Sequence, residues 1–173
     1  MYSDFRTWAK HQHDVVCNQK YNKTLTYSVH LDGVAHKVSV FYTQDFDFKL
    51  HHAMDVAYGH DLIEDARVTY NDVKNASCEI VAEAIFNCTE SVGRNRAERH
   101  DEAYKARILS SELSLFVKLC DLAANITFGL FQSGNMIEKY REEFPTFEAR
   151  IRLLPNAKKF EPIITHINNL LNA

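Results

Sequence analysis

The sequence is poor in the residues that interrupt helices. Only five of its 173 residues are glycine, and the three prolines, Pro145, Pro155 and Pro162, all lie near the end. Long stretches without proline and glycine favour helices, because these two residues are the strongest breakers of regular structure. Apolar residues also recur every three or four positions, most regularly over residues 113–124. We therefore predict a compact all-α fold, with residues 1–173 forming one domain.

The limits of the predicted helices follow from where this apolar spacing begins and ends. The segment Thr69-Tyr-Asn-Asp72 has the pattern of a capping box, in which side chains satisfy the free backbone groups at a helix start. We expect helices at residues 4–16, 27–42, 48–63, 70–76, 78–90, 96–109, 112–133, 135–143, 146–153 and 158–171.

Several common catalytic motifs are absent. Neither G-x-G-x-x-G nor G-x-x-x-x-G-K-[ST] occurs, and no serine lies in a G-x-S-x-G segment. The four cysteines include no C-x-x-C pair, so we expect them to be reduced and mostly buried. These absences argue against a glycine-rich phosphate loop and give no support to a serine or cysteine nucleophile.

Charge and hydropathy give no reason to expect a nucleic-acid or membrane partner. The net charge is −3, and the basic residues form no extended stripe. No apolar stretch approaches the roughly 20 residues that cross a membrane, and residues 1–10 do not resemble a secretory signal. We expect a cytoplasmic protein. The sequence leaves the oligomeric state open, with a homodimer as one candidate.

Nine histidines are many for this length, and three of them precede an aspartate, in the pairs His13-Asp14, His60-Asp61 and His100-Asp101. The first and third pairs lie in strongly polar stretches, and we interpret them as solvated helix faces. The second pair lies at the end of a partly apolar helical segment, where both side chains would be buried. Buried imidazoles and carboxylates must be paired or must bind a metal.

Two more acids follow the second pair at helical spacing. Glu64 lies four residues after His60, and Asp65 lies four residues after Asp61. All four side chains therefore cluster around one end of one helix. Carboxylates this close repel one another unless protons or a cation intervene. A divalent metal is one solution, and it would need further ligands from other helices.

Two candidates for these further ligands lie in apolar helical patterns. They are His30, within residues 27–35, and Asp121, within residues 115–125. An unpaired acid in such an apolar run destabilises the fold. A salt bridge from Asp121 to Lys118, or a capping hydrogen bond, would also explain the acid. The residues alone leave these alternatives open beside metal ligation.

The order of these residues resembles the H…HD…D signature of the HD superfamily of metal-dependent phosphohydrolases. The closer likeness is to the RelA/SpoT-like hydrolases, which remove the 3′-pyrophosphate of the alarmone (p)ppGpp. It extends over residues 15–150. YSVHLDGVA is similar to Y-x-x-H-P-x-x-V-A, HDLIEDARVT to H-D-x-x-E-D-T-x-x-T, and VKLCDLAAN to V-K-L-A-D-x-x-x-N. Leu31 and Ala66 depart from this pattern, as does Met136, where an arginine is expected one turn before Tyr140.

The resemblance implies a small stand-alone hydrolase that acts on a nucleotide with the help of one divalent cation, usually manganese. The implied metal ligands are His30, His60, Asp61 and Asp121. Glu64 and Asp65 would position and deprotonate the attacking water. Asn125 would reach the substrate or a metal ligand, Lys118 would lie near phosphates or pair with an acid, and Tyr140 would stack on the substrate.

Basic residues offer a separate route to phosphate binding. The segment 94–107 could form a wall of positive charge from Arg94, Arg96, Arg99, Lys105 and Arg107. The alternative is that these residues pair with Glu98, Asp101 and Glu102 on a solvated helix. Lys20 and Lys23, which precede the helix of His30, are similar candidates with the same alternative.

Two other functions are compatible with the same residues. One is an HD-type 5′-nucleotidase or dNTP triphosphohydrolase, which would keep the metal site and change the substrate. The other is a degenerate HD fold that binds a nucleotide or a protein without catalysis, and its signature would be a lost ligand. Retention of Glu64-Asp65 favours the alarmone hydrolase over the first alternative. The presence of all four expected ligands argues against the second.

Overall fold

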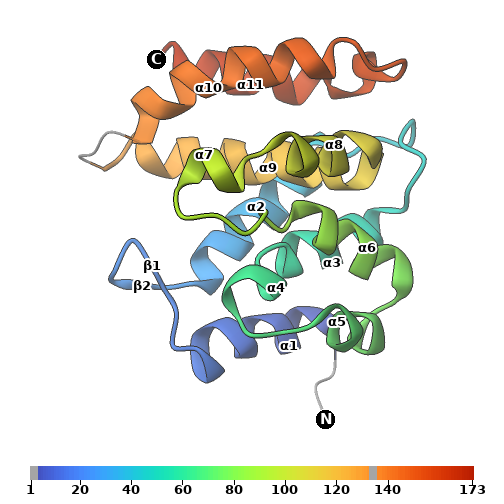
Figure 1. The fold of residues 1–173 in the computed structure, drawn as a ribbon, viewed down its shortest axis with the longest axis vertical. Coiled ribbons are helices and arrows are strands. Elements are labelled where there is room, and N and C mark those ends of the chain that lie inside the picture. Colours follow the sequence, from blue (N-terminus) through green and yellow to red (C-terminus); the bar gives the residue numbers. More distant parts are fainter. Residues whose placement is uncertain (1–3, 133–135) are drawn as a thin grey trace.

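The computed structural model describes residues 4–132 and 136–173, which fold into α-helices, two short helical turns and one small hairpin (Figure 1). This confirms the predicted all-α class. The elements in chain order are α1 (Phe5–His11), η1 (Gln12–Val16, π-helical), β1 (Lys20–Tyr21), β2 (Leu25–Thr26), α2 (Ser28–Phe41), α3 (Leu50–Gly59), α4 (Leu62–Asp65), α5 (Tyr70–Ala76), α6 (Glu79–Cys88), α7 (Arg96–Arg99), α8 (Glu102–Ser110), α9 (Glu112–Gly129), α10 (Met136–Ile151), η2 (Ala157–Phe160, 3₁₀) and α11 (Glu161–Leu171).

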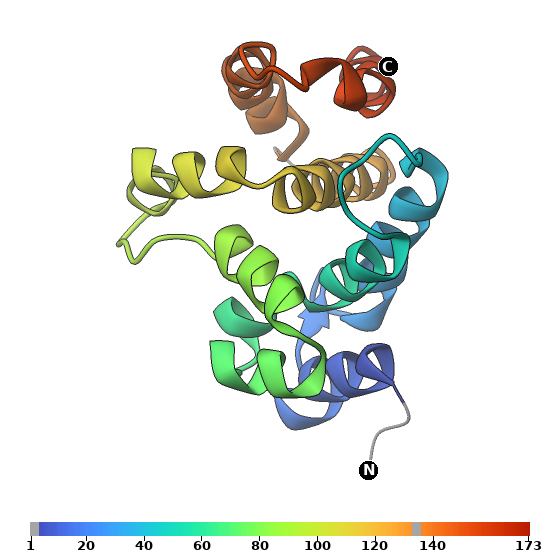
Figure 2. The same cartoon turned by 90° about the vertical axis from the view of Figure 1, so that its right-hand side faces the viewer.

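Helix α9 lies at the centre of the fold and contacts α2, α3, α6, α8, α10 and α11. Figure 2 shows the layers from the side, with the C-terminal helices above α9 and the N-terminal helices below it. Most of α9 is buried, including Phe116, Leu119 and Ile126 at 0% exposure. Burying each such side chain contributes roughly 1.5–3 kcal/mol. A polar residue on α9 therefore has a fixed position deep in the molecule.

The predicted helix at residues 48–63 is interrupted near its C-terminal end. His60 and Asp61 form the joint between α3 and α4 instead of continuing one helix. The last residue of α3 is Gly59, and a Cβ added there would lie 2.5 Å from Ile85 Cδ1. A larger residue would fit only if the buried side chains of Ile85 and Phe5 moved aside. The joint is therefore held against α6.

The predicted helix at residues 96–109 is interrupted in the same way. His100 and Asp101 form the joint between α7 and α8. The Asp101 carboxylate accepts a hydrogen bond from the backbone N–H of Tyr104 at 2.7 Å and so caps α8. Aspartate is a preferred N-cap because its oxygen satisfies a backbone donor that the first turn leaves free. The new helix start replaces the predicted continuous helix.

Other helix boundaries differ less. The capping box at Thr69 and Asp72 is present, as predicted. The predicted helices at 135–143 and 146–153 are joined in α10, which continues through Pro145. The predicted boundaries at residues 133 and 135 lie outside the described residues.

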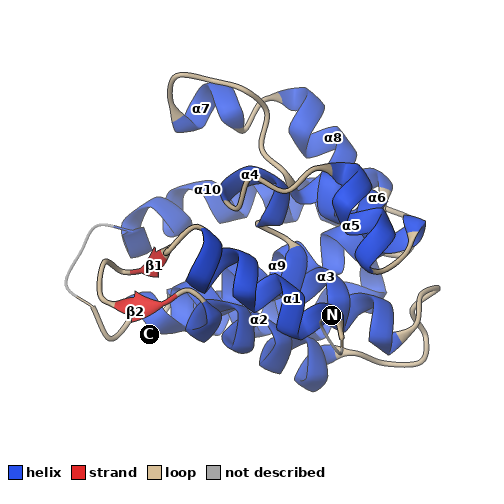
Figure 3. Cartoon of the chain, turned by 90° about the horizontal axis from the view of Figure 1, so that it is seen from below, coloured by secondary structure: helices blue, strands red, loops and turns tan. Residues whose placement is uncertain are grey.

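The N-terminal segment contains two features that the sequence did not indicate. The predicted helix at 4–16 changes from α1 to the π-helical η1. The hairpin pairs Lys20 with Thr26 and Tyr21 with Leu25, and Figure 3 shows it at the opposite end of the molecule from α5 and α6. Two-residue strands are too short to show the alternating pattern that identifies a strand. No helix in the part of the chain that is described is long and apolar enough to cross a membrane.

Candidate metal centre and substrate cleft

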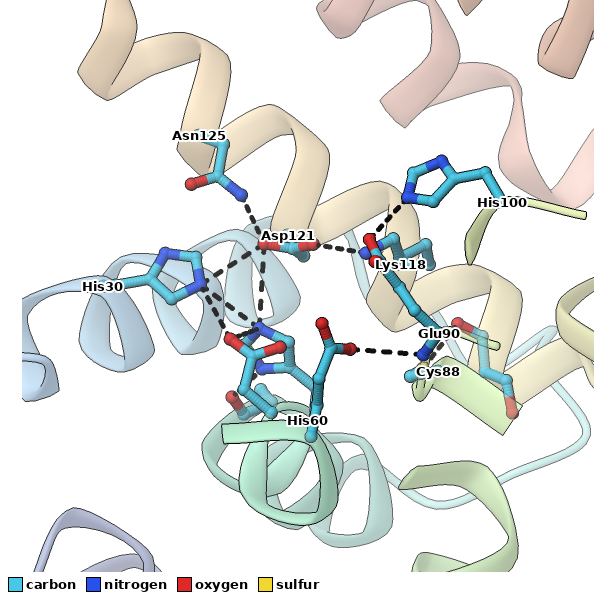
Figure 4. A network of polar contacts seen from close by, with 12 residues as sticks. His30, His60, Cys88, Glu90, His100, Lys118, Asp121 and Asn125 are labelled. Atoms are coloured by element: carbon cyan, nitrogen blue, oxygen red, sulfur yellow. Dashed lines mark hydrogen bonds and ion pairs between the residues drawn. The ribbon is translucent and has the colours of Figure 1, made fainter. Parts of the chain in front are cut away.

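Three buried side chains from three parts of the chain converge between α2, α3 and α9. His30, His60 and Asp121 each offer a ligand atom, and these atoms lie within 4.8 Å of one another. His30 Nε2 lies 3.2 Å from His60 Nε2 and 3.3 Å from Asp121 Oδ1. Asp61 Oδ2 lies 3.1 Å from His60 Nε2 and 3.7 Å from His30 Nε2. The structure thus brings the four predicted ligands together, and Figure 4 labels His30, His60 and Asp121 among them.

These distances fit the coordination shell of one cation. Two ligand atoms bound at about 2.1 Å stand roughly 3.0 Å apart at a right angle and about 3.4 Å apart at a tetrahedral angle. Imidazole nitrogens and carboxylate oxygens are also ligands that first-row divalent metals accept. The buried group of His30, His60 and Asp121 could therefore hold a metal ion.

The electrostatics of the cluster also call for positive charge. Burial alone would lower the pKa of His60, but Asp61 and Asp121 raise it well above its usual value. Burial would raise the pKa of both carboxyl groups, but Lys118 and the histidines hold that of Asp121 well below its usual range, and His60 lowers that of Asp61. Both acids therefore stay ionised. Lys118 supplies one positive charge beside Asp121, and a proton on His60 or a metal ion would supply a second.

Neighbouring groups orient two of the ligands. His60 Nδ1 donates a hydrogen bond to the carbonyl oxygen of Ala57 at 2.9 Å, so that Nε2 faces the cluster. Asn125 Nδ2 donates to Asp121 Oδ1 at 2.6 Å, and Lys118 Nζ donates to Oδ2 at 3.0 Å. The Asp121–Lys118 pair is thus present, and it uses the carboxylate oxygen that does not contact the histidines. The pair and metal ligation are compatible.

Two tyrosines complete the surroundings of the ligands, and the sequence analysis assigned a role to neither. The Tyr27 hydroxyl donates a short hydrogen bond to Asp61 Oδ2. The Tyr21 hydroxyl donates to Asn125 Oδ1 at 2.9 Å, and its ring stacks on His30 with the centroids 4.9 Å apart. Tyr27 lies one helical turn before His30, and this spacing could have identified it. The short strand that carries Tyr21 offered no such signal.

The cluster borders a cleft of about 870 Å³. Most of the predicted site residues line it, namely His30, Asp61, Glu64, Asp65, Arg96, Lys118, Asp121, Asn125 and Tyr140. Lys20 is not among the described residues that line this cleft, and it lies exposed on β1. The structure therefore separates this lysine from the other predicted substrate residues.

Glu64 and Asp65 lie on α4 at the solvent-exposed side of the cleft. Glu64 Oε2 accepts a hydrogen bond from the Glu90 backbone N–H at 3.1 Å, and Asp65 Oδ2 accepts one from Gln19 Nε2 at 2.9 Å. Partial burial raises the pKa of Glu64 to about 7 and also raises that of Asp65. A carboxyl group with a pKa near neutrality can both accept and release a proton at physiological pH.

The predicted wall of basic residues is divided between the surface and the cleft. Arg94 Nη2 pairs with Glu98 at 3.0 Å on the surface, as the alternative interpretation expected. Arg96 lines the cleft and forms a two-point pair with Glu143, at 3.0 Å from Nε and 2.9 Å from Nη2. Lys105 also lines the cleft and contacts an acid of its own helix. The cleft therefore holds positive charge that is already paired.

The remaining basic residues of this segment serve the fold. His100 and Arg99 both contact the Glu90 carboxylate and lower its pKa to about 2, against the opposing effect of burial. Arg107 Nη2 donates to the Thr89 carbonyl oxygen at 2.9 Å. The His100 side chain is 21% exposed and borders the cleft, so the prediction of a fully solvated face is wrong there.

The interpretation of His13-Asp14 as a solvated face is also wrong. His13 is 0% exposed, its ring stacks on Tyr27 and its Nδ1 lies 2.6 Å from Gln19 Oε1. Asp14 Oδ1 accepts a hydrogen bond from the Ser28 backbone N–H, at the start of α2. The π-helical turn directs His13 inward, although its sequence neighbours are polar.

Comparisons with known proteins show the fold of the chain. No protein-family profile matches the sequence, and no curated protein matches it either. One similar solved structure is described as a metazoan ortholog of SpoT that hydrolyses ppGpp and plays a role in starvation responses. The likeness covers 99% of this chain and 96% of that one, with a TM-score of 0.68 and 14% sequence identity. The chain therefore has the helical fold that the resemblance implied.

Proposed function

We propose that this protein is a metal-dependent hydrolase of phosphorylated nucleotides, and that its substrate is (p)ppGpp, from which it removes the 3′-pyrophosphate. One observation carries this proposal: the ligand cluster and the two acids Glu64 and Asp65 border the same cleft. Ligands that face a cleft leave room for substrate beside the cation, whereas purely structural metal sites are closed. Acids with raised pKa values beside such a site are typical of hydrolytic chemistry.

The chain's own residues would divide the work as follows. A divalent cation held by His30, His60, Asp61 and Asp121 would supply Lewis acidity to the phosphoryl group and the attacking water. Glu64 or Asp65 takes the proton from this water, since both carboxylates lie at the cleft.

Binding of the nucleotide would use the other walls of the cleft. Lys118, Arg96 and Lys105 bring positive charge to the phosphate oxygens, and Arg96 would exchange its pairing with Glu143 for a phosphate. Tyr140 offers an aromatic ring for stacking, as the resemblance implied. The cleft volume lies in the range of roughly 300–1,000 Å³ that small-molecule ligands occupy.

The choice of (p)ppGpp rests on two supports. The first is the sequence resemblance, and the second is the fold shared with a protein that is described as hydrolysing ppGpp. A 5′-nucleotidase or dNTP triphosphohydrolase would use the same metal ligands. Substrate discrimination must therefore be measured directly.

The test is the release of phosphate and pyrophosphate from ppGpp, GTP, dNTPs and nucleoside monophosphates by metal-stripped protein, with and without Mn²⁺. Asp121→Ala removes a ligand, and Asp101→Ala is the matched control, because Asp101 caps α8 and is not among the described residues that line the cleft. We expect Mn²⁺-dependent pyrophosphate release from ppGpp by the wild type and the control only. Activity confined to dNTPs or monophosphates would overturn the substrate. The absence of both turnover and metal binding would indicate a degenerate binding module.

A further inference from the structure

His13, on the π-helical turn η1, is a fully buried polar side chain outside the ligand cluster. It is 0% exposed, and its Nε2 has no hydrogen-bond partner among the residues that the structure describes. A buried polar atom without a partner destabilises the fold. An apolar side chain would fill this position at lower free energy. A contact made by the other ring nitrogen, Nδ1, would therefore have to justify a histidine at this position.

Nδ1 of His13 is connected through Gln19, by two hydrogen bonds, to the carboxylate of Asp65 in the cleft. His13 Nδ1 lies 2.6 Å from Gln19 Oε1, and Gln19 Nε2 lies 2.9 Å from Asp65 Oδ2. The Asp65 carboxylate only accepts hydrogen bonds, so the Gln19 amide group must donate to it through Nε2. Oε1 then faces the histidine and accepts, and Nδ1 of His13 must carry the proton. The direction of both hydrogen bonds is fixed by their end at the carboxylate.

The His13 ring also supports, through Tyr27, the metal-ligand candidate Asp61. His13 stacks on Tyr27 with the centroids 4.7 Å apart and an interplanar angle of 25°. The Tyr27 hydroxyl donates to Asp61 Oδ2. One buried imidazole thus supports the group that orients Asp61 and, through Gln19, the group that orients Asp65.

Asp65 needs this support more than the metal ligands do. It is the last residue of the four-residue helix α4, and its side chain is exposed. An exposed side chain samples several rotamers unless a hydrogen bond restricts it. A general base must lie within hydrogen-bond reach of the proton that it removes. The hydrogen bond from Gln19 occupies Oδ2 and leaves Oδ1 for a water molecule.

We propose that His13 and Gln19 are positioning residues for the proposed hydrolysis, and that they hold the Asp65 carboxylate in its working orientation. This inference rests on the proposed function. Neither residue touches the reacting atoms; each acts through the next one in the order His13, Gln19, Asp65. Loss of their hydrogen bonds, with a ring kept on Tyr27, therefore changes turnover and leaves metal affinity and substrate affinity nearly unchanged.

The test compares kcat, KM and Mn²⁺ affinity in three variants. His13→Phe keeps a buried ring on Tyr27 and removes the donor. Gln19→Met keeps the length of the side chain and removes both hydrogen bonds. We expect each to lower kcat by roughly 10- to 100-fold, which is the loss typical for groups that orient the residues of a metal site, with KM and Mn²⁺ affinity changed less than twofold. His13→Asn, whose amide nitrogen replaces Nδ1, should recover much of this loss.

The double variant of His13→Phe and Gln19→Met gives the sharpest result. The losses from two residues that act through one chain of contacts are not additive. The kcat of the double variant should therefore be no lower than that of the less active single variant. Additive losses, or a loss confined to thermal stability with kcat unchanged, would show that the two side chains serve the fold only. Gln19 is half-buried, so its variant is expected to fold even where a change at His13 impairs folding.

A readout that needs no activity separates this inference from the proposed function. In ¹⁵N-labelled metal-free protein, His13 should be the neutral tautomer with its proton on Nδ1. The other tautomer would overturn the chain of hydrogen bonds whatever the activity. The expected tautomer in a wild type without phosphohydrolase activity would refute the proposed function, and the positioning role would fall with it.

Discussion

The two joints that carry a His-Asp pair have the same local architecture and opposite uses. In each, the histidine follows the last residue of one helix and the aspartate precedes the first residue of the next, at residues 60–61 between α3 and α4 and at residues 100–101 between α7 and α8. Asp101 stabilises the fold through Oδ1, which accepts hydrogen bonds from the Tyr104 N–H at 2.7 Å and from the Ser91 hydroxyl at 2.9 Å. Within the described structure, Asp61 makes no capping bond.

The two histidines differ in the same sense. His60 is 2% exposed, and its Nδ1 is bound to a backbone carbonyl, so its Nε2 faces two other potential ligands. His100 Nε2 contacts the Glu90 carboxylate instead. A side chain is available as a ligand when backbone partners orient it without occupying its ligand atom. The dipeptide itself does not decide this, and the surrounding helices do.

The largest effect that separates the two joints is expected from Asp61→Ala. Loss of a ligand should remove several kcal/mol of transition-state stabilisation, which corresponds to a fall of roughly 1,000-fold or more in kcat/KM. Asp101→Ala is the control and should leave kcat/KM unchanged. Steady-state assays with saturating Mn²⁺ check both. Equal activity of the two variants would refute the distinction between the joints.

A smaller effect is expected when the group that orients Asp61 is changed. Tyr27→Phe keeps the aromatic ring and removes the hydroxyl that donates to Asp61 Oδ2. Loss of a group that hydrogen-bonds to a metal ligand typically weakens metal affinity by roughly 10- to 100-fold. Calorimetric titration of metal-stripped protein with Mn²⁺ measures it. Tyr70→Phe is the matched control, because its hydroxyl donates to an exposed acid, Glu83, outside the cleft. A loss of similar size in both variants would contradict the assigned role of Tyr27.

The raised pKa of Glu64, which lies beside the joint at residues 60–61, should make stability depend on pH. The pKa of Glu64 is raised from 4.5 in the unfolded chain to about 7, chiefly by burial. The folded state therefore binds the extra proton between these values, so the free energy of unfolding falls as the pH rises from about 4.5 to 7. Urea unfolding of metal-free protein across this range should show that Glu64→Gln flattens the decline. Glu98→Gln should not, since the pKa of Glu98 is lowered by Arg94. Parallel curves for wild type and Glu64→Gln would refute this prediction.

The smallest expected effect belongs to the capping aspartate. Asp101→Ala removes the acceptor for the first turn of α8 and should reduce the free energy of unfolding by about 1 kcal/mol. Chemical denaturation measures the change, and Mn²⁺ affinity measured on the same sample should match that of the wild type. A loss of metal affinity would mean that the second joint contributes to the metal site after all.

The ligands could be predicted from the sequence because they stand out from their surroundings. His30, His60 and Asp121 are polar residues within apolar helical patterns, and apolar surroundings oblige polar groups to find partners. The four predicted ligands do come together in the structure, and the all-α fold is confirmed. That they bind a metal remains a prediction.

The supporting residues could not be predicted in this way. His13 has polar neighbours, and only the π-helical turn, which no spacing pattern indicated, directs it inward. Gln19 and Tyr21 border a hairpin of two-residue strands, in which a pattern of alternation cannot be recognised. Lys20 belongs to the same hairpin, and its charge alone suggested a place near phosphate. Positions that depend on tertiary contacts between distant segments leave little trace in local sequence.

The most direct test of the central claim is anomalous diffraction from crystals of this protein soaked in Mn²⁺. We predict one strong peak per chain, within roughly 2.0–2.3 Å of His30 Nε2, His60 Nε2 and Asp121 Oδ1 and of a carboxylate oxygen of Asp61. No peak at this position, with Asp121 still bound to Lys118 and both histidines unchanged, would contradict the claim that these residues form a metal centre.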